Sequence, residues 1–225
     1  MLAAGRRKSP QADQALEELC RTYWYPLYAY VRRQGHAHED AEDLAQAFFA
    51  RLLEKNYLEG LSSEKGKFRA FLLASLKHFL ANEWDKSQRQ KRGGGITPIS
   101  LDWQDADTRY QIEPADRLSP DRLYDRAWAV TVLERVITRL ANECATDGKT
   151  GLFNQLRPFL MADLEAIPYA QAAAALAMTE SAVRVAVHRL RRRYRELLRE
   201  EISQTLSDPA QAAEEIKTLL GAFAD

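Results

Sequence analysis

The chain has 225 residues, of which 46% are hydrophobic and 28% charged, and its 32 Lys and Arg residues balance its 32 Asp and Glu residues. This length allows one large core or two small ones. No apolar run approaches the roughly 20 residues that span a bilayer, and the first residues lack the apolar stretch of a secretory signal. Composition therefore excludes a membrane-inserted protein and predicts a cytoplasmic one, in which the isolated Cys20 and Cys144 are reduced, packed thiols.

The zero net charge hides a segregation of charge along the chain. Residues 39–54 hold five acids against one arginine, and residues 65–92 hold eight Lys or Arg against two acids. Residues 101–125 then hold seven acids against three arginines, and residues 184–199 hold seven arginines against one glutamate. Such alternation indicates basic surfaces that meet a polyanion and acidic surfaces that meet a basic protein, or the chain's own basic blocks.

The first 92 residues show helical spacing of apolar positions and no strand-like alternation. A first helix is predicted from Asp13, with Pro26 as a kink or break and Gly35 after its end. A second helix follows through Leu44, Phe48 and Leu52, and a third covers Lys67–Lys86. This half of the chain is predicted to be an all-α domain over residues 12–92.

Residues 93–122 are predicted to be an acidic, flexible linker, because they begin with three glycines and contain three prolines and many aspartates. A second helical domain is predicted over residues 123–203, with Val130, Leu133, Ile137 and Leu140 as its first apolar stripe. Residues 204–225 are predicted to add an amphipathic helix from Asp208 to Phe223, with Pro209 near its start. That helix is expected either to pack on its own domain or to dock on a partner, and its acids could mask the arginine-rich segment.

The acidic helix and the basic aromatic helix each suggest a chemistry. The acidic helix carries carboxylates beside an apolar ridge, which suits an interface with a basic protein. A divalent metal held by His36, His38 and Asp40 is the alternative. In the third helix, rings alternate with cations, as in proteins that stack on unpaired bases; spacing alone favours core positions for Phe68, Phe71 and Phe79 and leaves Trp84 open.

The stretch YAQAAAALAMTESAVRVAVHRLRRRYR, Tyr169 to Arg195, reads as a helix-turn-helix. A break at Ala177–Met178 precedes Thr179, a natural N-cap. Val183, Val187 and Leu190 form an inward stripe, and the opposite face is rich in arginine. Two short helices with a basic second helix suit insertion into a DNA major groove, while an ordinary helical hairpin with a solvated face is the alternative.

These segments, in this order, resemble the sigma-70 family of bacterial RNA polymerase initiation factors, in particular the extracytoplasmic-function (ECF) subfamily. DAEDLAQAFFARLL is similar to the family's polymerase-binding segment, and KFRAFLLASLKHFLANEWDKSQRQKR resembles its −10 segment. Tyr169–Arg191 resembles its −35 helix-turn-helix. The resemblance covers residues 15–92 and 125–200, and departs from the family pattern at Ala177, where glycine is frequent, and at Phe71, His78 and Asn82.

The resemblance implies a two-domain, all-α initiation factor without catalytic residues, cofactor or metal, whose partners are core RNA polymerase and promoter DNA. An anti-sigma factor or another regulator is a further candidate partner. The implied polymerase-binding residues are Asp40, Asp43, Leu44, Gln46 and Phe49. The implied −10 residues are Phe68, Arg69, Lys77, Asn82, Trp84, Arg89 and Arg92. The implied −35 residues are Thr179, Ser181, Arg184, Val185, His188, Arg189, Arg191 and Arg192.

Two other functions account for part of the sequence. A response-regulator-type activator would use the helix-turn-helix without replacing the sigma subunit, but it leaves DAEDLAQ and the basic aromatic helix unexplained. A nucleic-acid-processing enzyme would instead use the metal site suggested by His36, His38 and Asp40.

Overall fold

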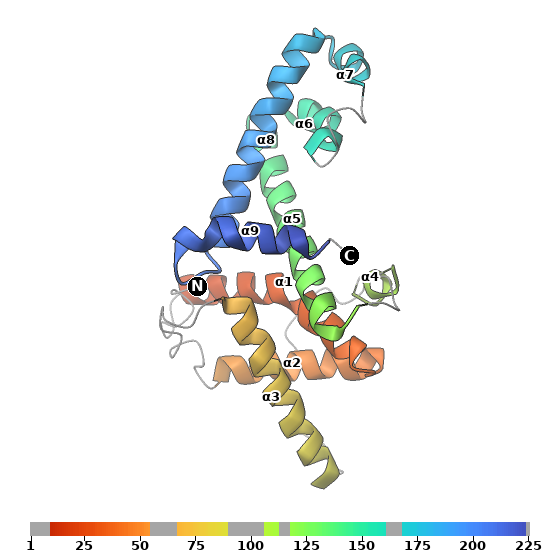
Figure 1. The fold of residues 1–225 in the computed structure, drawn as a ribbon, viewed down its shortest axis with the longest axis vertical. Helices are drawn as coiled ribbons and strands as arrows, with labels where there is room; N and C mark the ends of the chain where they lie inside the picture. The colour runs from red at the N-terminus through yellow and green to blue at the C-terminus, as the bar shows by residue number, and fades with distance from the viewer. Residues whose placement is uncertain (1–9, 55–66, 90–105, 113–117, 161–167, 224–225) are drawn as a thin grey trace. The chain divides into compact units, whose positions relative to one another are not determined.

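A computed structural model describes residues 10–54, 67–89, 106–112, 118–160 and 168–223 (Figure 1). The elements in chain order are α1 (Pro10–Arg33), α2 (His38–Glu54), α3 (Phe68–Arg89), α4 (Ala106–Ile112), α5 (Pro120–Thr146), α6 (Thr150–Leu156), the 3-10 turn η1 (Arg157–Leu160), α7 (Tyr169–Leu176), α8 (Glu180–Ser203), the 3-10 turn η2 (Pro209–Gln211) and α9 (Ala212–Gly221). Within the described residues the structure is helical, with a single isolated bridge between Lys67 and Leu206. The predicted all-α class is confirmed.

The chain divides into two compact units. Unit 1 comprises the described residues of Met1–Thr131 and Ser203–Asp225, and unit 2 is Val132–Ile202. The start of α5 therefore belongs to unit 1, whereas the sequence predicted it in the second domain. All of α9 also belongs to unit 1, whereas the sequence predicted it in a separate tail.

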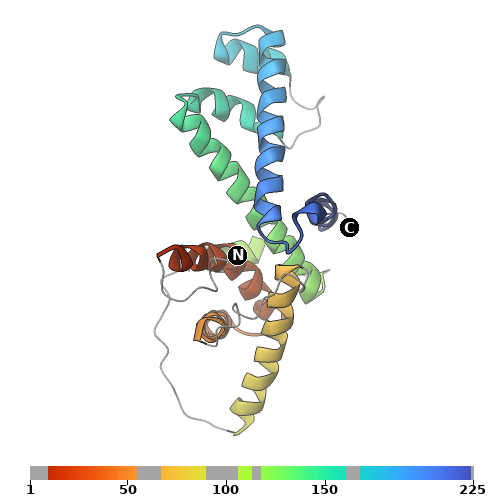
Figure 2. The same ribbon diagram turned by 90° about the vertical axis from the view of Figure 1, so that its left-hand side faces the viewer.

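Unit 1 is built on α1, against which α2 and α3 both lie (Figure 2). Every residue from Thr22 to Val31 is buried, so this part of α1 is enclosed on all sides. Aromatic rings join the three helices: Tyr23 meets Phe68 edge-on at 5.3 Å between ring centroids, and Phe48 of α2 meets Phe79 of α3 at 5.7 Å.

Pro26 does not interrupt α1, which is a single helix from Pro10 to Arg33. A proline inside a helix loses one backbone hydrogen bond and costs about 3 kcal/mol. Here it lies within the fully buried stretch of α1, where apolar burial on both sides offsets that cost. Gly35, with φ of +95°, follows the helix and allows the turn into α2, as the sequence predicted.

Part of the segment expected to be a linker is helical. Asp107 of α4 accepts a hydrogen bond from the Tyr28 hydroxyl (3.2 Å) and pairs with Arg32 (3.1 Å), both on α1. Arg109 lies 4.1 Å above the ring of Tyr25. These contacts hold α4 against α1, and Asp107 neutralises a cation of the chain itself.

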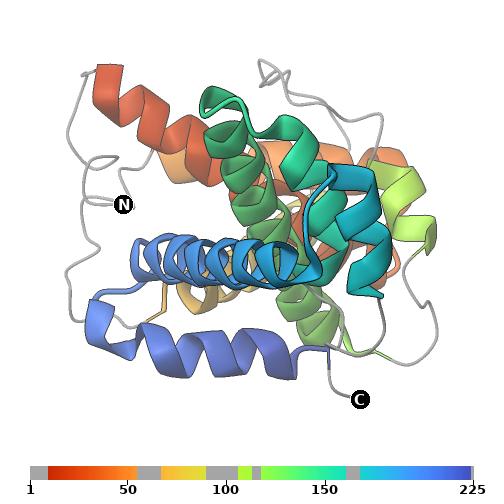
Figure 3. The same cartoon turned by 90° about the horizontal axis from the view of Figure 1, so that it is seen from above.

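In unit 2, α6, η1, α7 and the first half of α8 share one small core (Figure 3). The buried residues of this core are Leu156, Phe159, Tyr169, Ala172, Ala173, Val183 and Val187. The expected inward stripe of α8 is present, with Leu190 partly buried against it. On α5 the buried positions are Val132, Val136 and Leu140 in this unit, whereas the expected Val130, Leu133 and Ile137 are only half-buried.

The C-terminal segment is helical but shorter than predicted. Asp208 caps η2 by accepting a hydrogen bond from the backbone N–H of Ala210 (3.0 Å), and α9 follows. Leu219 is buried and Ile216 half-buried, while Leu220 and Phe223 of the predicted stripe are exposed. None of the helices in the described parts of the chain is long and apolar enough to cross a membrane.

Candidate functional site

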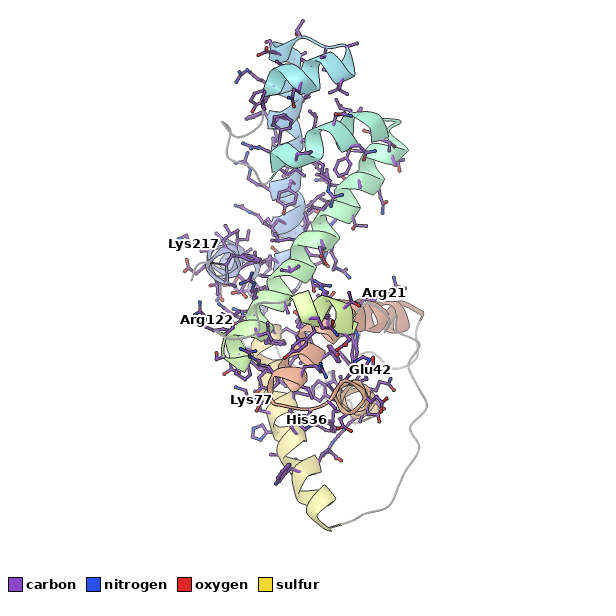
Figure 4. The ribbon with its side chains drawn as sticks, turned by 90° about the vertical axis from the view of Figure 1, so that its right-hand side faces the viewer. Arg21, His36, Glu42, Lys77, Arg122 and Lys217 are labelled. Atoms are coloured by element: carbon purple, nitrogen blue, oxygen red, sulfur yellow. The ribbon has the colours of Figure 1, made fainter. Side chains whose placement is uncertain are left out.

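The acids of α2 border an open groove on unit 1. Asp40 and Asp43 are exposed, and Leu44 is half-buried beside them. Together with residues of α1, the α1–α2 connection and α3 they line a groove of about 730 Å³, whose other walls are Tyr30, Gln34, His36, Lys77, Leu80, Glu83 and Trp84. His36 and Lys77 face this side of the unit in Figure 4. The groove combines an acidic edge with apolar walls.

The other two residues of the expected polymerase-binding set differ in exposure. Gln46 is half-buried on α2. Phe49 is completely buried and packs against Trp24 and Phe48, with ring centroids 6.4 and 5.9 Å away. Its ring is therefore part of the core of unit 1 and is not exposed to a partner in this structure.

Sequence reasoning missed the contribution of α1 to the groove. Tyr30 and Gln34 line it, and the Gln34 side-chain amide donates a hydrogen bond to the Tyr30 hydroxyl (3.0 Å). Their spacing of four residues at the end of a helix is a signal that could have placed them on one face.

The far end of α3 carries an exposed aromatic ring. The side chain of Trp84 is 64% exposed, and Asn82 is exposed two residues earlier. Asn82 also borders a smaller hollow of about 200 Å³ between α2 and α3. A single exposed ring is common on protein surfaces, so its exposure leaves the indole accessible without identifying what it binds.

The charge of Lys77 is already compensated within unit 1. Its ammonium group lies 2.8 Å from Asp121 of α5, and a hydrogen bond to this carboxylate raises the pKa of Lys77. Both side chains are largely exposed, so the pair is weak and exchange with a phosphate costs little.

Phe68 and Arg69, at the start of α3, are buried. The Arg69 guanidinium donates to Glu215 of α9 (2.6 Å), pairs with Asp125 of α5 and lies 4.9 Å above the ring of Trp128. Burial alone would lower the pKa of Arg69, but the two carboxylates have the larger effect, and together they raise it. Neither side chain reaches solvent in this structure. The side chain of Arg89 and the whole of Arg92 lie outside the described residues.

In unit 2 the expected −35 residues occupy the outer face of α8. The Thr179 hydroxyl accepts a hydrogen bond from the backbone N–H of Ala182 (3.2 Å), which confirms the predicted N-cap. Exposed side chains then follow on this face: Ser181, Arg184, Val185, His188, Arg189 and Arg192. Among the described residues, neither His188 nor Arg189 has a hydrogen-bond or ion-pair partner, so both are available to a ligand.

The remaining arginines of α8 differ in their availability. Arg191 is half-buried and donates to the backbone carbonyl of Phe159 (2.7 Å). Arg193 makes a two-pronged pair with Glu143, each bond 2.8 Å long, and the pairing lowers the pKa of Glu143. Arg184 lies 4.3 Å above the ring of Tyr169, which holds the guanidinium against the start of α7.

The three residues of the alternative metal site do not act as one cluster. Nδ1 of His38 is 2.8 Å from the Tyr28 hydroxyl, and its Nε2 is 3.4 Å from Glu42. His36 and Asp40 instead line the groove. The described part of the chain contains no group of three or more His, Cys, Asp or Glu side chains that could hold a metal ion.

Comparison with known proteins relates part of unit 1 to a known family. Residues 19–90 match the family described as Sigma-70 region 2, a range that includes α2, α3 and the groove. Neither the curated proteins nor the solved structures contain a match to the chain. The chain thus carries a sigma-70 region 2 domain, which supports membership of the sigma-70 family and points to a role in promoter recognition and RNA polymerase binding.

Proposed function

We propose that this protein is a transcription initiation factor of the ECF type, which binds core RNA polymerase and directs it to promoters through −10 and −35 elements. One observation carries the proposal: the region 2 match falls on a unit whose groove joins exposed acids to an exposed tryptophan. The activity is one of binding and positioning, with no catalytic step assigned to the chain, and it takes place in the cytoplasm with the polymerase.

The polymerase-binding surface consists of Asp40, Asp43, Leu44 and Gln46. Exposed carboxylates beside half-buried apolar groups suit a basic, amphipathic helical element of the polymerase. Charge complementarity would accelerate the encounter, and the groove walls would supply the apolar contact area.

The −10 surface includes Asn82 and Trp84 at the end of α3, and in the sequence Arg89 and Arg92 follow them. Base–aromatic stacking contributes about 1–3 kcal/mol per base, which helps to offset the few kcal/mol needed to deform and melt the duplex. Lys77 would exchange Asp121 for a phosphate. Because Phe68 and Arg69 are buried, they enter this surface only if unit 1 rearranges.

The −35 surface is the exposed face of α8, used as the second helix of a helix-turn-helix. Residues near its start would reach base edges, and a bidentate arginine–guanine contact contributes about 1–3 kcal/mol of discrimination. Arg192, whose side chain is 74% exposed, and Arg191 would hold phosphates, which gives affinity without sequence choice. The two DNA-reading parts correspond to the expected domains 12–92 and 123–203, with residues 93–122 between them. An anti-sigma factor or other regulator remains a candidate partner.

Reconstitution with core polymerase tests the proposal. The purified protein is added to core polymerase with a library of upstream DNA, and the transcripts are sequenced. Defined start sites that share two spaced elements support the proposal, whereas start sites no better defined than with core alone refute it. Transcription that rises only when a sigma subunit is also present would identify an activator instead.

A matched pair of charge reversals tests the polymerase-binding surface. Asp43→Lys reverses an acid that lines the groove, and Gln46→Ala, added to it, removes the half-buried amide of the same surface; Glu39→Lys reverses a neighbouring exposed acid that does not line the groove. We expect the first variant to weaken binding to core polymerase by about tenfold or more, because like charges would face each other, and the control to bind nearly as the unaltered protein. Equal binding by both variants would remove this surface from the proposal.

A further inference from the structure

The C-terminal segment of the chain lies against the start of α3 in unit 1. The backbone N–H of Phe68 donates to the carbonyl of Thr205 (3.3 Å), and Lys67 and Leu206 form an antiparallel bridge. The chain then turns through η2 into α9 (Figure 1), which brings Glu215 to the same place. Glu215 of the tail thus contacts α3 within unit 1.

Glu215 is held by two cations at once. Its side chain is 1% exposed; Oε1 accepts from the Arg69 guanidinium (2.6 Å), and Oε2 lies 2.5 Å from the Lys67 ammonium. A carboxylate is buried at this depth only when it is paired. Lys67 and Arg69 therefore form a site that binds an oxyanion, and the Glu215 carboxylate of the tail occupies this site.

The attachment of α9 depends on few side chains. The buried residues of α9, which face the rest of unit 1, are Ala212, Glu215 and Leu219. Its exposed residues include Glu214, Lys217 and Leu220. Lys217 projects from the solvent side of α9 in Figure 4. An isolated helix as short as α9 is unstable in water, so loss of these contacts would release the whole segment.

We propose that Lys67 and Arg69 form a phosphate-binding site for nucleic acid, and that the C-terminal segment competes for it through Glu215. With the tail docked, the site is closed. With the tail released, both cations lose Glu215, and a phosphate has to displace only Asp125, whose side chain is 42% exposed, from Arg69. Arginine and lysine bind phosphate oxygens by the same charged hydrogen bonds that they make to a carboxylate. This competition depends on one part of the proposed function, namely that the protein binds DNA.

The salt dependence of DNA binding by the full chain tests this competition. Each phosphate neutralised on duplex DNA adds about −0.9 to the slope of log K against log salt concentration. Two released cations should therefore make the slope steeper by about 1.8. The probe is a duplex of random sequence without polymerase, so the result does not depend on promoter recognition or initiation.

Two variants release the tail by different means, each with a matched control on the exposed side of α9. Glu215→Lys places a cation against Lys67 and Arg69, and Glu214→Lys makes the same charge change in solvent. Leu219→Asp removes the buried apolar contact, and Leu220→Asp makes the same change at an exposed position. We expect the steeper slope in the two buried-side variants and not in the controls, and we expect it to vanish when Lys67→Gln and Arg69→Gln are added.

Three results would overturn the proposal. The first is an unchanged slope in both release variants, and the second is a steeper slope that persists without Lys67 and Arg69. The third is loss of amide protection throughout α1–α3 in both release variants, since the tail would then be a permanent part of the core. Failure to initiate transcription would instead refute the proposed function and leave this comparison intact.

Discussion

The turn between α7 and α8 stores backbone strain at one residue, Ala177. Its φ of 50° and ψ of 40° place it in the left-handed region, which side chains with a Cβ rarely adopt. The backbone N–H of Met178 donates to the carbonyl of Ala173 (2.9 Å), and that of Ala177 donates to Ala174 (3.3 Å). These two bonds form a Schellman motif, whose left-handed position is most often glycine.

We predict that Ala177→Gly stabilises unit 2. The left-handed conformation costs an alanine about 1–2 kcal/mol, and glycine avoids this cost. Glycine also gains freedom in the unfolded chain, which costs about 0.4–1 kcal/mol. The difference is a gain of about 0.5–1 kcal/mol in the free energy of unfolding, because the hydrogen bonds of the motif are unchanged.

Native-state hydrogen exchange measures this gain at buried amides of α8, such as that of Val187, without treating the whole chain as two-state. Ala174→Gly is the control, because Ala174 is exposed and inside α7, where glycine should cost about 0.5–1 kcal/mol. If both glycines destabilise unit 2 equally, Ala177 is not strained and the reasoning fails.

Two further predictions concern charge and stacking. Because hydrogen bonding to Arg193 lowers the pKa of Glu143, the pair stabilises unit 2 above the ordinary pKa of a glutamate, and this contribution is lost as the pH falls through the lowered value. Glu143→Gln should cost at most about 1 kcal/mol at pH 7, since the pair is partly exposed, and should flatten the acid limb of a denaturation series below the ordinary pKa of a glutamate; an unchanged acid limb would contradict it. Trp84→Ala should change the free energy of unfolding by no more than about 0.5 kcal/mol but weaken capture of a melted −10 strand by about 1–3 kcal/mol. Trp84→Phe should restore most of that capture in a fluorescence assay of promoter opening, and equal loss in both variants would exclude stacking.

Local signals in the sequence were sufficient for much of this fold. Gly35 marks the end of α1, Thr179 caps α8, and Val183 and Val187 face inward as their spacing predicted. Each of these depends on residues within one or two helical turns. Of the two outcomes predicted for Pro26, the break does not occur, because the buried surroundings of α1 tolerate the proline, and a local pattern does not contain those surroundings.

Contacts between distant residues could not be predicted in this way. Asp107 looks like a residue of an acidic linker, yet it pairs with Tyr28 and Arg32 on α1. Arg69 looks like a DNA-binding cation, yet its partner Glu215 lies 146 residues away. Charge patterning indicated where acidic and basic residues are concentrated but not which pairs form, because any acid can pair with any cation until packing fixes the distances.

The charged residues of α8 serve two purposes along one helix. In its second half, Glu201 pairs with Arg135 (2.9 Å), Glu200 with Arg139 (2.7 Å) and Arg193 with Glu143, so these charges join α8 to α5 within unit 2. In its first half, His188 and Arg189 have no such partners among the described residues. Counterion release on DNA binding depends only on cations that reach phosphates. The salt dependence of −35 binding should therefore reflect the first half of α8, and a count of arginines in the sequence overestimates it.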